Sequence, residues 1–253
     1  MKRFLQKHSW LLLALAAALL IGGGVGSARA ALVAQSNLYT AQIDTSSLSV
    51  CLMEKANSGE SAGTYVQRTG NDLLTAMLPE GEEIKPGQTY DESLAVFNNG
   101  GYEEYVRVVV KKSWKNADGT KNQTLDPALI DLTYLIGEDW IIDENLSTDE
   151  RTVLYYTHVL PAGESVVPFT GTLTVSTETS GAVEYLDENG NTVDPDSVSG
   201  NITTSYLYNG ELVCIEAEVD AVQTHNAADA MYGAWGVRLN VSEDGTVSLP
   251  DGQ

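Results

Sequence analysis

Histidine and cysteine are scarce in this chain, which has 3 histidines and 2 cysteines in 253 residues. After the first thirty residues the histidines are His158 and His225, and neither has the H-E-x-x-H spacing with which zinc hydrolases bind their metal. The chain also lacks a P-loop and a G-x-G-x-x-G motif after a strand. These absences predict no catalytic residues, no metal ligands and no cofactor. We therefore expect a protein that is not an enzyme.

Basic residues are also few, with 14 Lys and Arg against 35 Asp and Glu. The first thirty residues hold four basic residues and no acidic one, so the rest of the chain carries a net charge of −25. A surface this acidic repels nucleic-acid phosphates and anionic lipids. We expect no nucleic-acid partner. The acidic exterior is expected to be solvated, with calcium binding as the alternative.

Long apolar runs are limited to one, Trp10–Ile21, which follows a short basic start. It is shorter than the roughly 20 residues that a membrane-spanning helix needs. Small residues follow and end in Ala28-Arg29-Ala30, which matches a secretory signal peptide over residues 1–30, cleaved between Ala30 and Ala31. An uncleaved anchor is the alternative. We expect signal peptidase as a partner during export, then a secreted chain with no membrane insertion after cleavage.

The two cysteines, Cys51 and Cys214, both lie in strand-like alternations. The pattern places each thiol on the face opposite the apolar one. Export permits a disulfide between them, but pairing requires the two Cα atoms to approach within about 7 Å. The alternative is two independent, semi-exposed thiols.

The hydrophobic period is mostly two, as β-strands require. Many strands, regular turns and few helices predict an all-β protein, a jelly-roll or immunoglobulin-like β-sandwich with one or two short helices. Residues 31–253 are expected to form one domain, with a polar inserted loop over 180–205. The expected extended segments are 38–52, 93–97, 105–114, 139–143, 152–159, 166–175, 183–186, 192–193, 206–219 and 236–241.

Two short helices are expected. Asp126-Pro127 can cap and start the first, which would run to about Leu132, because proline suits the first helical position. The second runs from Asn226 to Trp235, with Asn226 as its cap and Gly236 as its left-handed exit.

Five segments of the chain are informative when they are read in order. They are Ser27–Leu32 with Tyr39–Ile43, Val96–Gly100 with Tyr105–Val108, Trp140–Asp143, Asp149–Tyr156, and Glu216–Ala227. In this order they resemble the TasA and camelysin-like proteins of Firmicutes, over nearly the whole of residues 31–253. The resemblance implies export by a dedicated signal peptidase, a jelly-roll-like fold and assembly into biofilm matrix fibres. For camelysin-like members it implies a surface metallopeptidase activity.

The first functional hypothesis is a secreted structural subunit of an extracellular matrix or cell-surface fibre. Cleavage would free an N-terminal strand, residues 31–43, and an exposed sheet edge in a neighbouring copy could accept it. Its partners would be other copies of itself or related matrix subunits. The alternative is that this segment folds back as the first strand of its own sandwich. The side chains expected to enter the acceptor are those of Leu32, Tyr39, Ala41 and Ile43.

Two other functions are the alternatives. A camelysin-like metallopeptidase is disfavoured by the missing zinc-ligand pattern. A calcium-stabilised adhesion module would use Asp187–Asn191, but this segment departs from the EF-hand pattern, and its Asn-Gly pair is typical of a hairpin turn. A second acidic group, at 138–139, 143–144 and 149–150, is expected to be a solvated loop.

Overall fold

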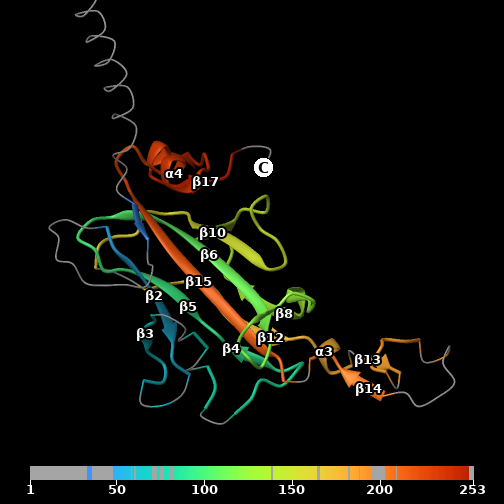
Figure 1. The fold of residues 1–253 in the computed structure, drawn as a ribbon. Helices are drawn as coiled ribbons and strands as arrows, with labels where there is room; N and C mark the ends of the chain where they lie inside the picture. Colours follow the sequence, from blue (N-terminus) through green and yellow to red (C-terminus); the bar gives the residue numbers. More distant parts are fainter. Residues whose placement is uncertain are drawn as a thin grey trace, which may run out of the picture.

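The chain folds as an all-β sandwich with short helices, shown as a computed structural model in Figure 1. The structure describes residues 33–35, 48–57, 59, 61–69, 73–74, 77–79, 82–137, 139–163, 166–181, 183–187, 189–194, 196, 203–208 and 210–250. The cleavage pair Ala30 and Ala31, and the donor residues Leu32, Tyr39, Ala41 and Ile43, lie outside the described residues. Among the described residues, no helix combines the length and apolarity of a membrane span.

The first layer is built around two long strands, β6 (Glu104–Lys115) and β15 (Leu212–Gln223), which pair antiparallel along their whole length. The sheet order is β1-β15-β6-β10-β9, with β7 paired to the end of β6. The remaining strands of this layer are β1 (Val33–Gln35), β7 (Lys121–Asn122), β9 (Trp140–Ile142) and β10 (Arg151–Tyr156).

The second layer consists of two smaller sheets with the orders β11-β5-β2-β3 and β4-β12-β8. A short 3-10 turn, η1 (Pro127–Leu129), is capped by the side chain of Asp126 and leads directly into β8 instead of continuing to Leu132. The strands of this layer are β2 (Val50–Lys55), β3 (Tyr65–Gln67), β4 (Thr89–Asp91), β5 (Leu94–Asn98), β8 (Ile130–Tyr134), β11 (Val167–Pro168) and β12 (Thr170–Val175).

The main hydrophobic core lies between these two layers and includes Trp114 and Trp140. It explains the alternation along β6, because Val106, Val108 and Val110 all point into it and are at most 1% exposed. Burial of this apolar area is the main stabilising contribution to such a sandwich. Trp114 and Trp140 are at most 3% exposed within it.

A second cluster covers the outer face of the first layer. Helix α4 (Ala227–Trp235) packs Met231 and Trp235 against residues of β6 and β10 such as Val109 and Tyr155. The predicted helix and its left-handed exit at Gly236 are confirmed, but Asn226 makes no side-chain cap and itself lies in the left-handed region at φ 51°. The chain then forms a small strand pair, β16 (Asn240–Val241) and β17 (Val247–Ser248).

The segment predicted as a polar inserted loop over 180–205 contains the strand expected at 183–186, and a second strand that was not expected begins at Thr203. After the one-turn helix α3 (Glu178–Gly181), β13 (Val183–Leu186) pairs antiparallel with β14 (Thr203–Tyr206). This hairpin projects from one end of the sandwich in Figure 1, at the end opposite α4. Its two strands are distant in sequence, so their pairing was not evident from local alternation.

The expected strand over 166–175 is divided between two sheets. β11 pairs with β5 and β12 pairs with β4 and β8, and the break falls at Phe169, which is fully buried. The expected extended segments at 139–143 and 152–159 contain β9 and β10, which pair antiparallel.

Candidate functional site: an open strand edge beside a groove

Among the residues that the structure describes, one edge of β15 is only partly paired. Its inner edge is covered by β6 over all of Leu212–Gln223. Its other edge pairs with β1 only at Asp220–Val222. Over Leu212–Val219, no other described strand or loop makes backbone hydrogen bonds to that edge. Such an edge carries backbone N–H and C=O groups that can bind another strand.

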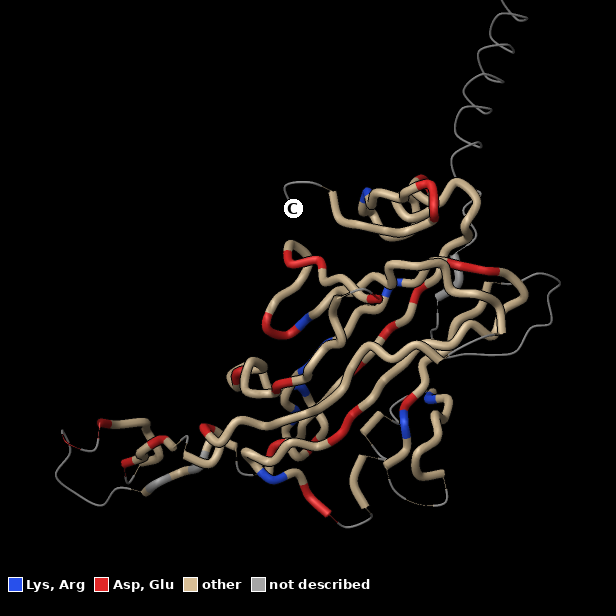
Figure 2. The backbone as a smooth tube through the Cα atoms, turned by 180° about the vertical axis from the view of Figure 1, so that it is seen from behind, with Lys and Arg blue, Asp and Glu red and all other residues tan. Residues whose placement is uncertain are grey.

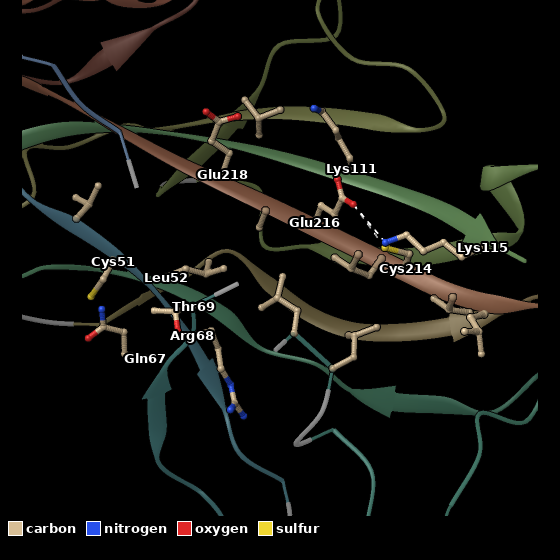
Figure 3. Close-up of a pocket in the computed structure, with 18 of the residues that line it drawn as sticks. Cys51, Leu52, Gln67, Arg68, Thr69, Lys111, Lys115, Cys214, Glu216 and Glu218 are labelled. Atoms are coloured by element: carbon tan, nitrogen blue, oxygen red, sulfur yellow. Dashed lines mark hydrogen bonds and ion pairs between the residues drawn. The ribbon is translucent and has the colours of Figure 1, made fainter. Parts of the chain in front are cut away.

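A groove of about 950 Å³ runs beside this open edge (Figure 3). One wall comes from β15 and the adjoining part of β6, and the other from β2 and the segment that follows β3. The lining residues are Ser49, Val50, Cys51, Leu52, Gln67, Arg68, Thr69, Leu73, Leu74, Asn99, Val109, Lys111, Lys115, Leu212, Val213, Cys214, Ile215, Glu216, Ala217 and Glu218.

The side chains of β15 alternate between two environments along this edge. Val213, Ile215 and Ala217 pack on the core side, as their sequence pattern predicts. Cys214 and Glu216 lie on the opposite face, where Glu216 contacts Lys115 at 3.5 Å. The alternation gives the edge an apolar side and a charged side. An incoming strand therefore meets different chemistry on its two faces.

The opposite wall also presents an incompletely paired strand. β3 covers β2 only at Met53–Lys55, and the Leu52 carbonyl accepts a further hydrogen bond from the Arg68 N–H at 2.9 Å. On that side no described segment pairs with Val50 or Cys51. The groove thus lies between two strands, one from each layer, whose facing edges both have open positions. This geometry leaves room for one additional extended segment.

Charged residues are buried in the β2 wall. Arg68 contacts Glu54, with the Nε to Oε2 distance 2.5 Å, and the side chains are 16% and 0% exposed. Glu54 also accepts a hydrogen bond from the N–H of Leu74, a residue whose backbone lies in the left-handed region at φ 69°. The neighbouring Glu92 is fully buried. Burial raises the pKa of Glu92 to about 9, and the charge and hydrogen bond of Glu54 add to this effect while Arg68 opposes it.

This buried carboxyl gives a prediction for pH dependence. The folded chain keeps a proton on Glu92 that the unfolded chain releases above its ordinary pKa of 4.5, so the free energy of unfolding falls as pH rises from 4.5 to about 9. We expect Glu92→Gln to raise the free energy of unfolding by about 2–3 kcal/mol at pH 7 and hardly at all at pH 4.5.

Urea unfolding at several pH values measures this effect. The exposed Glu103→Gln is the matched control and should leave the pH profile of the parent unchanged. If Glu92→Gln and the parent gave the same dependence of unfolding free energy on pH, the raised pKa of Glu92 would be contradicted.

Another buried carboxyl lies where the chain enters β2. Glu104 is fully buried, and its pKa is raised to about 7 by burial, with the Ser49 backbone N–H opposing this shift. The Ser49 carbonyl in turn accepts a hydrogen bond from Asn99 N–H at 3.0 Å. These contacts fix the position at which the N-terminal segment joins the sandwich, beside the groove.

Both cysteines line the groove but are free thiols. Figure 3 shows Cys51 on β2 and Cys214 on β15, at different ends of the groove. The Cys51 thiol is buried and contacts the Phe97 carbonyl at 3.6 Å, so the expectation of a semi-exposed thiol is wrong for this residue. Burial raises the pKa of Cys51. Cys214 is half-buried, with Sγ 3.8 Å from the Glu216 carboxylate.

His158 and His225 do not line the groove. His158 faces Asp139 across 3.8 Å, and both side chains are largely exposed. His225 accepts a hydrogen bond at its carbonyl from the Gln223 side chain, just before α4. Within the described ranges, no three His, Cys, Asp or Glu side chains are grouped so that they could hold a metal ion.

In the acidic turns, aspartate carboxylates accept hydrogen bonds from backbone N–H groups of the same turn. The Asp187 carboxylate accepts hydrogen bonds from the N–H groups of Asn189 and Asn191, at 2.8 and 2.9 Å. These bonds lower the pKa of Asp187. Asp143 likewise accepts from Asn145 N–H. Figure 2 shows acidic residues spread over the molecule, with basic residues at fewer positions.

A serine motif that the sequence reasoning missed lies between β2 and β3. Gly59–Gly63 matches the G-x-S-x-G pattern of hydrolases, in which the serine occupies a sharp turn from a strand into a helix. Here Ser61 lies in an exposed turn between two strands, and its carbonyl accepts the Thr64 N–H at 3.0 Å. The structural context of a nucleophile is therefore not met.

Comparison of the chain with protein-family models, curated proteins and solved structures found no match. The fold by itself defines the class: an all-β sandwich with short helices, in which the described part of the chain leaves one edge of β15 partly unpaired beside a groove.

Proposed function

We propose that this protein is an exported structural subunit of an extracellular matrix or cell-surface fibre. Its copies would join when the N-terminal arm, defined here as residues 31–43, of one copy adds as a strand to the β15 edge of the next. The observation that carries the proposal is the open edge Leu212–Val219 beside the groove. The resemblance to TasA and camelysin-like proteins supports the same function.

The chemistry of the groove suits a peptide strand. Backbone pairing along the edge would supply hydrogen bonds with a net contribution of about 0.5–1.5 kcal/mol each. The core-side residues Val213, Ile215 and Ala217 offer an apolar surface to alternate side chains of the incoming strand. This combination of backbone pairing and alternate side-chain pockets is how strand addition achieves affinity and specificity.

The arrangement also favours an open chain of subunits. The arm and the groove are different surfaces of one molecule, so a contact between them is head-to-tail. A head-to-tail contact that does not close into a ring propagates as a filament. Related matrix subunits that carry a similar arm would be additional partners.

The acceptor side is tested by a charge placed in the groove. Ala217 is half-buried on the core side of β15, so Ala217→Lys should place an ammonium group where the donor side chains enter. We expect filaments of the processed chain to be lost, because burial of an unpaired charge opposes strand addition. Electron microscopy and sedimentation measure the effect.

Ala228→Lys is the matched control. It makes the same change at an exposed position on α4, which does not line the groove. Filaments should form with this variant. A thermal melt shows that both variants are folded. Normal filaments from folded Ala217→Lys would refute the β15 edge as the acceptor.

A further inference from the structure

Cations are concentrated on one face of the first layer. Residues 31–253 contain ten basic residues, since four of the 14 in the chain lie in the first thirty. Four of these ten lie on the outward face of the sheet, next to the part that α4 covers, and none of them is buried. We call this set the basic face, and it consists of Lys111, Lys115, Lys121 and Arg151.

The strand register sets these cations directly against each other. Arg151 of β10 is the partner of Lys111 of β6, and Lys121 of β7 is the partner of Lys115 of β6. Like charges directly opposite each other on neighbouring strands are destabilising. Two such pairs side by side, in a chain this acidic, indicate a surface that gains from an anionic partner.

Only part of this charge is compensated within the chain. Lys115 contacts Glu216 at 3.5 Å, and Lys121 contacts Glu150. Among the residues that the structure describes, the other two cations of the basic face form no ion pair. Figure 3 shows Lys111 and Glu216 on the side of the β6–β15 pair that is turned away from β2. The basic face is therefore open to a second molecule.

The β13–β14 hairpin has the opposite charge. No Lys or Arg occurs over residues 152–237. Figure 2 shows acidic positions and no basic ones on the projecting hairpin. Its described acidic residues are Glu184, Asp187, Asp194 and Asp196, and none of them is buried. The hairpin and the basic face are thus complementary in charge, although both belong to the same chain.

The hairpin also has little packing of its own. In the described part of the chain, no residue of β13 or β14 belongs to either hydrophobic cluster, and the β13 side chains are all half-buried. A ribbon of two strands is marginally stable by itself, so a contact with another surface would stabilise it. Figure 1 shows the hairpin pointing away from its own sandwich, which leaves a second copy as the source of that surface.

We propose that the basic face binds the β13–β14 hairpin of a second copy of this chain. The contact uses no residue of the arm and no backbone pairing along β15. A contact made of exposed ion pairs is weak. We expect a dissociation constant of about 1 mM, so this surface leaves micromolar subunits monomeric.

Repetition along a filament would multiply the contact. When many copies present the same two surfaces, weak contacts act together and the overall affinity rises steeply. The hairpins of one filament would then hold the basic faces of its neighbour, and filaments would lie side by side in bundles. This consequence rests on the proposed function, whereas the contact between two copies does not.

Charge reversal tests both sides of the contact. Lys121→Glu with Arg151→Glu reverses half of the basic face at residues that do not line the groove, so strand addition should be unaffected. Glu184→Lys with Asp196→Lys reverses the hairpin. A chain with all four substitutions exchanges the two charges and keeps the net charge of the parent.

Asp229→Lys with Glu243→Lys is the matched control for the hairpin variant. It makes the same change in net charge at exposed positions on α4 and in the turn between β16 and β17, which belong to neither surface. A thermal melt shows that every variant is folded.

Sedimentation equilibrium measures the contact in the full processed chain that carries Ala217→Lys, in which the proposed strand addition is blocked. The solution holds up to about 1 mM protein and about 0.15 M NaCl, which screens the long-range repulsion between acidic copies. We expect the basic-face variant and the hairpin variant each to weaken self-association at least about tenfold. The matched control should associate like the parent, and the chain with all four substitutions should regain the association.

Two results would overturn the contact. One is a hairpin variant that associates as strongly as the parent while the basic-face variant does not, since the basic face would then bind some other anionic group. The other is a chain with all four substitutions that stays as weak as the separate variants, since charge complementarity would not be the cause.

Electron microscopy of the processed chain without Ala217→Lys separates this inference from the proposed function. If no filaments form but the weak association and its recovery are found, the proposed function fails and the contact stands. If filaments form singly and no association is measured at about 1 mM, the fibre function stands and the contact is wrong.

Discussion

Removal of residues 31–43 from the processed chain is expected to abolish filaments and leave a folded monomer. In the proposed fibre the arm would supply a strand to the β15 edge of the next copy, so a chain without it should not extend the chain of subunits. The fold should persist, because within the described residues both hydrophobic clusters consist of side chains from Val50 onward. The only pairing lost from the described structure is β1 with Asp220–Val222.

The expected effect is large. Loss of the donor strand should raise the concentration needed for assembly by at least about a hundredfold, equivalent to about 3 kcal/mol per contact. Sedimentation and electron microscopy at matched concentrations give the measurement, and a circular dichroism melt verifies the fold. A synthetic peptide of residues 31–43 should bind the truncated chain as a control. Filaments from the truncated chain would refute strand donation by the arm.

The second large effect concerns the ion pair that links β6 and β15. Arg107 and Asp220 are directly opposed across the two strands, and the Arg107 Nε to Asp220 Oδ2 distance is 3.0 Å. The Asp220 side chain is fully buried and that of Arg107 is 13% exposed, with its guanidinium 5.5 Å from the Trp235 ring centroid. Removal of one partner leaves a buried charge uncompensated. We expect Arg107→Met to lower the free energy of unfolding by about 3–5 kcal/mol.

Urea unfolding measures this loss, and a double variant separates its cause. Arg107→Met with Asp220→Leu removes both charges, so most of the lost stability should return. The exposed pair Lys121 and Glu150 serves as the control, since loss of a surface pair costs about 0–1 kcal/mol. If the double variant is as unstable as Arg107→Met alone, the uncompensated charge is not the cause.

Strong local patterns made much of the fold predictable. The alternation along β6 reflects a strand whose Val106, Val108 and Val110 all reach one core, and the apolar stripe of α4 reflects packing on the sheet. Prediction failed where distant segments interact. β13 and β14 pair across a long polar connection, and the segment around Phe169 changes sheets because each half finds a different partner.

Burial was harder to predict than strand position. The alternation around Cys51 indicated an outward thiol, but β2 and β5 bury it beside the Phe97 carbonyl. Glu54, Glu92 and Glu104 were not recognised as buried, because nothing local in a sequence distinguishes a buried carboxylate from a solvated one. Their partners Arg68 and Ser49 are distant in sequence.

Only one of the two parts of the candidate site could be predicted from the sequence. The arm could be proposed from its position after the segment expected to be a signal peptide, since cleavage there would free it. The acceptor edge could not, because it depends on which strands pair with β15 and on where β2 lies beside it. A sequence shows that a strand exists; the topology determines which of its edges stays open.

The most direct test of strand donation mixes two chains, one without the arm and one with a blocked groove. The chain without residues 31–43 keeps the groove but has no arm, and Ala217→Lys keeps the arm but has a blocked groove. Neither should assemble alone. Light scattering after size-exclusion chromatography of the mixture should show a one-to-one heterodimer that grows no further. Two unchanged monomers, from chains that are each folded, would contradict the account.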